Sequence, residues 1–507
     1  MIELPDFSPL GVVQSQAVAS GKQYRTLDQL LIVLPQRPTP ELFRGLPQGR
    51  QLKTLLSRAP EKDTPIVSTR LGNARATGLT CSIFAADTSF AGLTWARKLI
   101  AEGSKDDPAK LGLLVVGFAD DERDRVIRYL VAAAAAAAFS LPAFKTSKSA
   151  KPARLRTLRI FAAKPRIDLG LTLAEAKGNN IARWLTGLPP NVLTASAYRE
   201  IAVSLARRHS LAAEFLDEKA LAKLKAGAFL AVSQGNAERD AGILRLKYRP
   251  AREKRPELAL VGKGVIFDTG GTNLKPFKGM LDMHTDMQGS AVALGTAIAL
   301  ADLAVAYPFD VWLAVTENRL SAEAYKSQDV VYAANGTSIQ VIHTDAEGRM
   351  ALADTLCLAA RENPLLIVDY ATLTGSCVVA LTERYSGVFS NSAGVYPLLQ
   401  DAGTASGERV WPFPMDEDFD EALRSDVADI KQCAADGSGD HILAARFLSR
   451  FVPGAIPWIH VDLSAGQHKG GLAHVPSEIT GFGVRLTLEL LHRRSQSPRA
   501  FLEQLGK

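Results

Sequence analysis

The segment ELALVGKGVIFDTGGTNLKP, Glu257–Pro276, decides the fold that we predict for this chain of 507 residues. It begins as an apolar strand and ends in a polar, glycine-rich turn. A strand of this kind is typical of a mostly parallel sheet covered by helices on both faces. Gly270 and Gly271 lack a Cβ atom, which permits a tight turn and the close approach of a ligand. We therefore expect chemistry at the carboxyl end of this strand.

Further apolar strands follow at intervals, and helical segments separate them. The strand candidates are FDVWLAV (309–315), LLIVDYATL (365–373) and WIHVDL (458–463), and the clearest helices are 288–306, 346–361 and 441–451. This alternation predicts a larger C-terminal α/β/α domain with a central mixed, mostly parallel sheet.

The first part of the chain shows the same alternation on a smaller scale. Its strand candidates are LLIVLP (30–35), TCSIFA (80–85), LGLLVVGF (111–118) and RTLRIFAA (156–163), with a polar loop at 144–155. The sequence thus predicts a small N-terminal α/β domain over residues 1–165, and the larger domain over 166–507.

Composition is that of an ordinary globular protein, with 47% hydrophobic and 22% charged residues. The N-terminus lacks the pattern of an export signal, and the longest apolar run, 129–139, is far shorter than the roughly 20 residues of a membrane-spanning helix. We therefore expect a cytoplasmic protein with no membrane association. The four cysteines form no CxxC pair, so we expect reduced core thiols.

A basic band lies between Arg125 and Arg166, where ten Lys or Arg residues occur without an Asp or Glu. Such a band could bind nucleic acid. We favour a solvated surface, because no aromatic interleaving or known DNA-binding motif accompanies the band.

Three segments place ionisable residues where a strand ends or a helix begins: 261–276, 283–289 and 343–350. Taken singly, Asp286 could cap a helix, and Asp345 could pair with Arg349 for about 0.3–0.5 kcal/mol. Four carboxylates at one sheet edge would repel one another unless divalent cations lay between them. The four are Asp268, Asp286, Asp345 and Glu347.

Two lysines accompany these acids. Lys263 could ligate a metal only as the neutral amine, which costs about 4.6 kcal/mol at pH 7 and which adjacent dications can offset. Lys275 would stay protonated and stabilise a developing oxyanion. Two cations about 3.5–4 Å apart can share a water and lower its pKa, so we predict metal-assisted hydrolysis.

Two other classes of site are disfavoured. The glycine-rich turn lacks the GxxxxGK[ST] pattern of a phosphate loop, and an aspartate there would repel phosphate. No GxSxG occurs in the sequence, which argues against a serine hydrolase of that type.

At these residues the chain resembles the leucyl aminopeptidase family, the M17 metallopeptidases, whose signature NTDAEGRL stands here as HTDAEGRM (343–350). The spacings from Lys263 to the other five metal and catalytic candidates and to Arg349 also agree with the family pattern. The resemblance extends from about Ala174 to Leu491 and includes LPPNVLT (188–194), DYATLTGS (369–376) and SGERVWPFP (406–414).

The resemblance implies an aminopeptidase that binds two divalent metal ions per subunit, Mn²⁺ or Zn²⁺, with Mg²⁺ or Co²⁺ as alternatives. The tightly bound ion would be held by Lys263, Asp268, Asp286 and Glu347, and the exchangeable ion by Asp268, Asp345 and Glu347. Lys275 would stabilise the gem-diolate, and Arg349 would hold a bicarbonate that acts as general base. The pocket for the first side chain of a peptide would be lined by Met283, Thr372 and Gly375.

The resemblance also implies peptide substrates with a free N-terminus and a homohexamer built as a dimer of trimers. An alternative function is a hexameric DNA-binding or structural protein that uses the 125–166 band. Several residues depart from the family pattern, among them His343, Gln288 and Ser464. We interpret His343 as a hydrogen-bonding neighbour of the site rather than a metal ligand.

Overall fold

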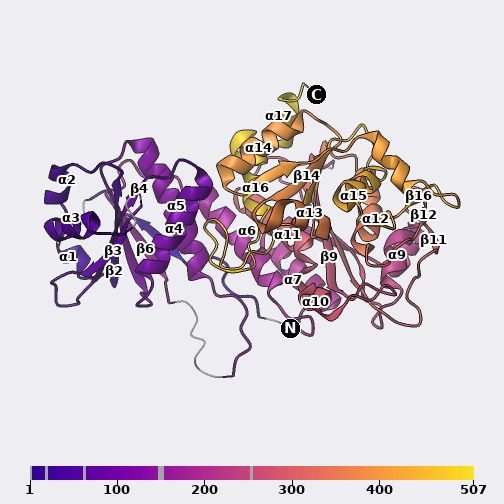
Figure 1. Ribbon diagram of the computed structural model, residues 1–507, viewed down its shortest axis with the longest axis horizontal. Helices are drawn as coiled ribbons and strands as arrows, with labels where there is room; N and C mark the ends of the chain where they lie inside the picture. Colours follow the sequence, from indigo (N-terminus) through magenta and orange to yellow (C-terminus); the bar gives the residue numbers. More distant parts are fainter. Residues whose placement is uncertain (1–2, 18–20, 61–63, 147–153, 252–254, 507) are drawn as a thin grey trace. The chain divides into compact units, whose positions relative to one another are not determined.

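The computed structural model describes residues 3–17, 21–60, 64–146, 154–251 and 255–506, and its contacts divide the chain into two compact units. The smaller unit comprises 6–177 and 469–478, and the larger unit comprises the remaining described residues. The division falls within α6 (Gly170–Thr186), between Lys177 and Gly178. The boundary that the sequence predicts, between residues 165 and 166, lies before this helix. Both units combine helices with a sheet (Figure 1).

The smaller unit contains a six-stranded sheet in the order β1-β6-β5-β2-β4-β3. All neighbouring strands are parallel except β3, which is antiparallel to β4. The strands are β1 (Gly11–Gln14), β2 (Gln29–Pro35), β3 (Ile66–Arg70), β4 (Gly78–Phe84), β5 (Lys110–Val115) and β6 (Thr157–Phe161), and the helices are α1 (Gly21–Tyr24), α2 (Pro40–Arg44), α3 (Gly49–Ser57), α4 (Ser89–Gly103) and α5 (Asp120–Ala138). The prediction of a small N-terminal α/β domain is confirmed. Residues 147–153 of the predicted loop lie outside the described residues.

The larger unit is built on an eight-stranded sheet in the order β15-β14-β17-β13-β9-β10-β8-β7. The central strands β17, β13, β9 and β10 run parallel, whereas β14, β8 and β7 form antiparallel pairs toward the edges. The strands are β7 (Ala212–Asp217), β8 (Gly242–Tyr248), β9 (Leu258–Asp268), β10 (Phe309–Asn318), β13 (Leu366–Ala371), β14 (Ser386–Ser390), β15 (Val410–Pro412) and β17 (Trp458–Asp462). The predicted mixed, mostly parallel sheet is confirmed. A separate small sheet joins β11 (Val330–Tyr332), β12 (Ser338–Gln340) and β16 (Ile430–Lys431).

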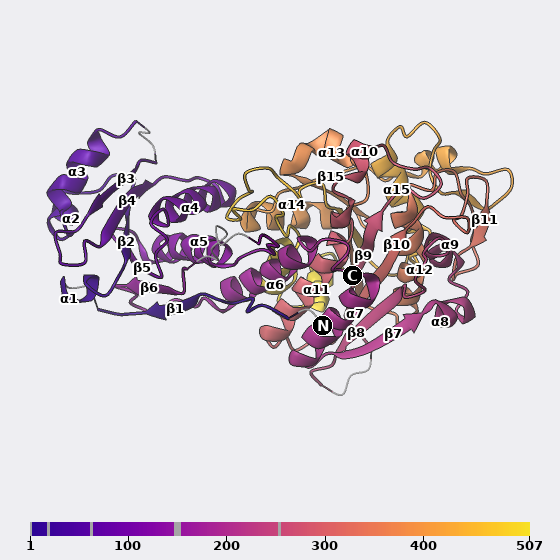
Figure 2. The ribbon, with the colours of Figure 1, turned by 90° about the horizontal axis from the view of Figure 1, so that it is seen from below.

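Helices cover both faces of this sheet. The helices α9, α12 and α15 pack together on one face, and α11 packs with α16 on the opposite side of β9 (Figures 1 and 2). The α-helices of this unit, besides α6, are α7 (Ala195–Arg208), α8 (Glu218–Lys223), α9 (Gly227–Ser233), α10 (Phe277–Met280), α11 (Gln288–Asp302), α12 (Glu347–Arg361), α13 (Gly375–Leu381), α14 (Val395–Ser406), α15 (Asp440–Ser449), α16 (Val484–Leu488) and α17 (Pro498–Glu503). Short helical turns occur at η1 (Met283–Thr285), η2 (Thr382–Arg384), η3 (Glu417–Leu423) and η4 (Glu489–Arg494).

Strand β9 is the centre of the larger unit and is buried along nearly its whole length. It lies between two parallel neighbours, β10 and β13, so the carboxyl ends of all three strands meet at one edge of the sheet. Helices α11 and α12 pack on β9 from opposite sides, and the residues before their first turns lie close to that edge. The fold therefore brings segments far apart in the sequence to one place.

All four cysteines are buried and free, as expected of core thiols. In the described part of the chain, no helix has the length and apolar character needed to cross a membrane.

Candidate active site

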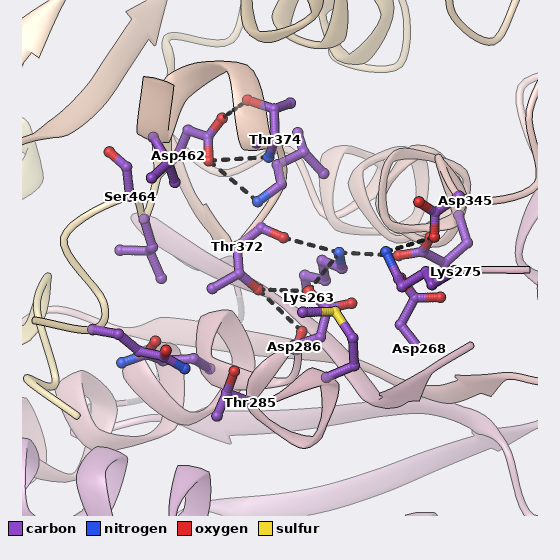
Figure 3. A pocket seen from close by; sticks show the side chains of 18 of the residues that line it. Lys263, Asp268, Lys275, Thr285, Asp286, Asp345, Thr372, Thr374, Asp462 and Ser464 are labelled. Atoms are coloured by element: carbon purple, nitrogen blue, oxygen red, sulfur yellow. Dashed lines mark hydrogen bonds and ion pairs between the residues drawn. The ribbon is translucent and has the colours of Figure 1, made fainter. Parts of the chain in front are cut away.

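A cavity of about 310 Å³ opens at the carboxyl ends of β9 and β13. Lys263 and Asp268 reach it from β9, Asp286 from the turn before α11, and Glu347 from the first turn of α12. Figure 3 shows Lys263, Asp268 and Asp286 converging on one side of the cavity. The cavity lining also includes the remaining predicted metal and pocket residues: Lys275, Met283, Asp345, Thr372 and Gly375.

The carboxylates form a compact cluster. One oxygen each of Asp268, Asp286 and Glu347 lies within 4.8 Å of the others, and all three residues are buried. Asp345 adjoins them just before α12 and is less buried. Such a concentration of acids requires nearby positive charge.

Lys263 supplies part of that charge. Its Nζ atom lies 2.8 Å from Asp286 Oδ1 and 3.0 Å from Glu347 Oε1, and it donates a hydrogen bond to the Thr372 carbonyl oxygen at 2.9 Å. The side chain passes directly over Gly348, where a Cβ atom would lie 2.5 Å from Lys263 Cε. Gly348 is therefore required for Lys263 to reach the carboxylates.

Lys275 makes the second pair of contacts. Its Nζ atom lies 3.0 Å from Asp268 Oδ2 and 2.6 Å from Asp345 Oδ1 (Figure 3). The side chain comes from the loop after β9, where Gly270 adopts a φ of 84°. This is the turn that the sequence predicts from the two adjacent glycines.

The charges shift one another's pKa values. Burial raises the pKa of Asp286 to about 6; the ammonium of Lys263 opposes this rise, and the charge of Asp268 adds to it. Burial and Asp268 also raise the pKa of Glu347 well above its usual value. Burial acts to lower the pKa of Lys263, but Asp286 and Glu347 outweigh it and raise that pKa. Without a divalent cation, Lys263 is thus held as an ammonium counter-ion.

The donor set fits divalent metal ions. Asp286 Oδ2 and Glu347 Oε2 are buried and have no hydrogen-bond partner within the described part of the chain. Buried carboxylate oxygens are rarely left unpaired, and a cation between them would satisfy both. Carboxylate oxygens with one amine suit Mn²⁺, Zn²⁺, Mg²⁺ or Co²⁺.

Neighbouring groups orient the carboxylates. Asn318 Nδ2 and the Gly270 N–H each donate to Asp268 Oδ1 at 2.8 Å, and Thr372 Oγ1 donates to Asp286 Oδ1 at 2.8 Å. The Asp345 N–H donates to His343 Nδ1 at 3.2 Å, so His343 is a hydrogen-bonding neighbour of the cluster. Sequence reasoning did not assign a role to Asn318, although it ends β10 at the expected edge of the sheet.

The cavity extends away from the carboxylates into a partly polar end. Thr285 and Ser464 border it there (Figure 3), with Gln288 and Gln467 among the lining residues. Gln288 is fully buried; its Nε2 donates to the Gly466 carbonyl oxygen at 2.9 Å, and its Oε1 has no partner among the described residues. The end of the cavity is therefore not purely apolar.

The guanidinium of Arg349 makes its hydrogen bonds outside the carboxylate cluster. Its Nη2 atom donates to both carboxylate oxygens of Asp440, at 2.8 and 2.7 Å, and its Nη1 atom donates to the Gln432 carbonyl oxygen at 3.2 Å. Sequence reasoning missed Asp440. An acid at the start of the predicted helix 441–451 was visible, but nothing in the sequence linked it to an arginine 91 residues away.

The fold and this cluster define a class of protein, a hydrolase with an α/β fold and a metallopeptidase type of site. Residues 180–488 match the model of the cytosol aminopeptidase family, catalytic domain, and the chain belongs to this family, whose members are metal-dependent. It is thus a leucyl aminopeptidase-like hydrolase.

Individual relatives agree with this assignment. A probable cytosol aminopeptidase of Chlorobaculum tepidum is 38% identical over 354 residues, which cover 68% of this chain and 69% of the relative. A mutant of tomato leucine aminopeptidase superposes with a TM-score of 0.82 at 25% identity, covering 97% of this chain and 98% of the other. The bottromycin maturation enzyme BotP in complex with Mn gives a TM-score of 0.77 at 27% identity, covering 91% and 98%.

Proposed function

We propose that the protein is an aminopeptidase that removes the N-terminal residue of peptides with a free N-terminus, using two divalent metal ions. The observation that carries this proposal is the buried cluster of acids with unpaired oxygens at the carboxyl end of β9. The residues that would hold the ions are Lys263, Asp268, Asp286, Asp345 and Glu347.

When bound, the metal pair would supply Lewis acidity to polarise the scissile carbonyl and lower the pKa of a water nucleophile. Lys275 lies at the mouth of the same cluster, and the negative charges of Asp268, Glu347 and Asp345 raise its pKa despite partial burial. It therefore remains an ammonium group that can stabilise negative charge developing on the carbonyl oxygen. Met283, Thr372 and Gly375 would contact the first side chain of the peptide.

Mn²⁺ and Zn²⁺ are the metals we propose, with Mg²⁺ and Co²⁺ as alternatives. The ligand types suit all four ions, and BotP, a similar structure, is described in complex with Mn. Bicarbonate at Arg349 fits less well, because Asp440 already pairs with that guanidinium.

We also propose a cytoplasmic homohexamer, arranged as a dimer of trimers. Several apolar side chains of the larger unit are exposed in the single chain, notably Phe277 at 77% and Val379 at 86%. Contacts between subunits would cover such groups. Sedimentation equilibrium should give about six times the chain mass of 54.4 kDa, and a monomer mass would contradict this assembly.

The alternative use of the 125–166 band in nucleic-acid binding gains no support from the described residues. Arg125 lies 3.8 Å from Glu122, and Arg154 lies 4.0 Å from Asp107, so these two basic groups have acidic neighbours. Lys148 and Lys151 lie outside the described residues.

Peptides with a free N-terminus, compared with the same peptides carrying an acetylated N-terminus, test the proposed activity. The purified, Mn²⁺- or Zn²⁺-loaded protein should release the first residue of a panel of short peptides, as measured by mass spectrometry. The same peptides with an acetylated N-terminus should remain intact. Cleavage of acetylated peptides, or no turnover of any free peptide, would contradict the proposal.

A further inference from the structure

The guanidinium of Arg349 already holds a carboxylate that belongs to the chain. Arg349 donates two hydrogen bonds from Nη2 to Asp440 and one from Nη1 to the Gln432 carbonyl oxygen. The Arg349 side chain is 2% exposed, whereas that of Asp440 is 25% exposed. A buried cation is thus neutralised by an acid at the border of the solvent.

This pairing disfavours a second anion at Arg349. A guanidinium binds a planar oxyanion through two parallel N–H groups, and each of its two bidentate edges includes one hydrogen of Nη2. The Asp440 carboxylate lies against Nη2, and Nη1 donates to the Gln432 carbonyl oxygen, whereas Nε is buried without a partner among the described residues. A bicarbonate on the remaining Nε edge would have to share Nη2 with the Asp440 carboxylate, and the two negative charges would repel each other.

The fold holds Asp440 in this position. It is the first residue of α15, where the helix N-terminus favours a negative charge. The next residue is also fixed, because the His441 N–H donates to Ser376 Oγ at 2.9 Å. Departure of Asp440 would leave the charge of Arg349 buried without a counter-ion, which is strongly unfavourable.

We infer that Asp440 permanently supplies the anion at Arg349 that the family resemblance assigns to bicarbonate, so that this enzyme works without bicarbonate. The inference rests on the proposed aminopeptidase function. Asp440 acts through Arg349, which lies two residues from Glu347 in the first turn of α12. Asp440 is therefore a positioning residue for the first turn of α12.

The wild-type enzyme gives the first test. Loaded with metal, it should show the same kcat and KM in CO2-free buffer and in buffer with added bicarbonate, at matched pH and ionic strength. Calorimetric titration with bicarbonate should show no saturable binding. A several-fold rise in kcat, or saturable binding, would overturn the inference.

Removing the carboxylate gives the second test. Asp440→Gly should lower kcat about tenfold or more in CO2-free buffer, as loss of a group that orients a metal-site element commonly does. Bicarbonate or formate should then restore much of the kcat with little change in KM, and the calorimetric titration should now show binding. Full kcat without added anion, or no anion binding, would overturn the inference.

Asp440→Asn and Asp420→Asn serve as matched variants. Asparagine keeps the shape of Asp440 but removes its charge, so kcat should fall and added anions should restore little, because the amide still covers Arg349. Asp420 forms a comparable bidentate pair with Arg446 of α15, at 2.7 Å from each oxygen. Asp420→Asn should leave the response to bicarbonate identical to that of the wild type, and a changed response would count against a specific role of Asp440.

The two proposals fail differently. If the wild type cleaved no peptide, the proposed function would fail, while the bicarbonate titrations would still decide the state of Arg349. If Asp440→Gly did not fold, the wild-type titration and Asp440→Asn would decide the inference.

Discussion

Asp286 combines a structural and a chemical role at the scale of single residues. One oxygen pairs with Lys263, and the other has no partner in the described part of the chain and faces the place proposed for a cation. Metal binding requires the ionised carboxylate, so protons and metal compete for this group. Burial raises its pKa to about 6, which places the competition close to neutral pH.

Metal content should therefore depend on pH. As the pH falls through about 6, Asp286 becomes protonated, and the metal affinity should decrease about tenfold per pH unit for each proton displaced. Dialysis at fixed metal concentration followed by elemental analysis measures this dependence. A metal content that stays constant from pH 8 to pH 5 at limiting metal would contradict the role of Asp286.

Gln288 is a second residue with a specific consequence. Its Oε1 atom is buried without a partner among the described residues and borders the partly polar end of the cavity. A donor on the first side chain of a substrate could satisfy it. Gln288→Leu should therefore raise kcat/KM for N-terminal leucine relative to asparagine by roughly tenfold.

A panel of aminoacyl amides measures this ratio, and the exposed Gln51→Leu provides the control. The control should leave the ratio unchanged. An unchanged ratio in Gln288→Leu would show that this side chain does not select the substrate.

At the scale of elements, Asp354 joins α12 to its neighbours. It is fully buried in the middle of the helix and accepts hydrogen bonds from the Phe229 N–H of α9 at 2.8 Å and the Ala334 N–H at 2.6 Å. Burial raises its pKa to about 7, although these backbone N–H groups act to lower it. The folded protein therefore retains a proton that the unfolded chain loses near pH 4.

This difference predicts a pH-dependent stability. The contribution of Asp354 is fully present below about pH 4 and is lost as the pH rises through about 7. The stability advantage of wild type over Asp354→Asn should thus shrink by up to a few kcal/mol between pH 4 and 8. Urea unfolding of both metal-free proteins across this range measures it, and an advantage that grows with pH would refute the assigned shift.

The central elements of the larger unit could be predicted because the residue pattern of each one is typical of a single kind of secondary structure. β9 is apolar on both faces, and α12 begins at Glu347, one residue from its predicted start. β8 was missed because Arg245 and Lys247 interrupt its apolar pattern. Arg245 is nevertheless buried, since Asp310 and Glu362 neutralise it.

The candidate site, too, could be predicted from the sequence only in part. The sequence identified the acids and lysines because they follow strands or begin helices whose ends must meet. It could not identify the pair of Arg349 and Asp440, because that contact depends on how α12 and α15 pack. Nor could it show that Lys263 pairs with carboxylates when no divalent cation is present.

At the scale of the whole molecule, the larger unit contains every residue proposed to bind metal or substrate. The match to the cytosol aminopeptidase catalytic domain, residues 180–488, lies within that unit apart from 469–478. The chemistry should therefore depend on this unit, and substitutions at its carboxylate cluster should abolish metal binding without unfolding the protein.

The most direct test compares the metal content and peptide turnover of the wild type with those of Glu347→Gln. Glu323→Gln, which changes an exposed glutamate of the same unit, is the control. For the wild type and the control, we predict two bound divalent ions per chain and release of N-terminal residues. For Glu347→Gln, we predict loss of at least one ion and a turnover lower by at least roughly a thousandfold, on the order of the loss of a metal-positioned catalytic group. A folded Glu347→Gln protein that keeps both ions and cleaves peptides at the wild-type rate would contradict the proposed metal site.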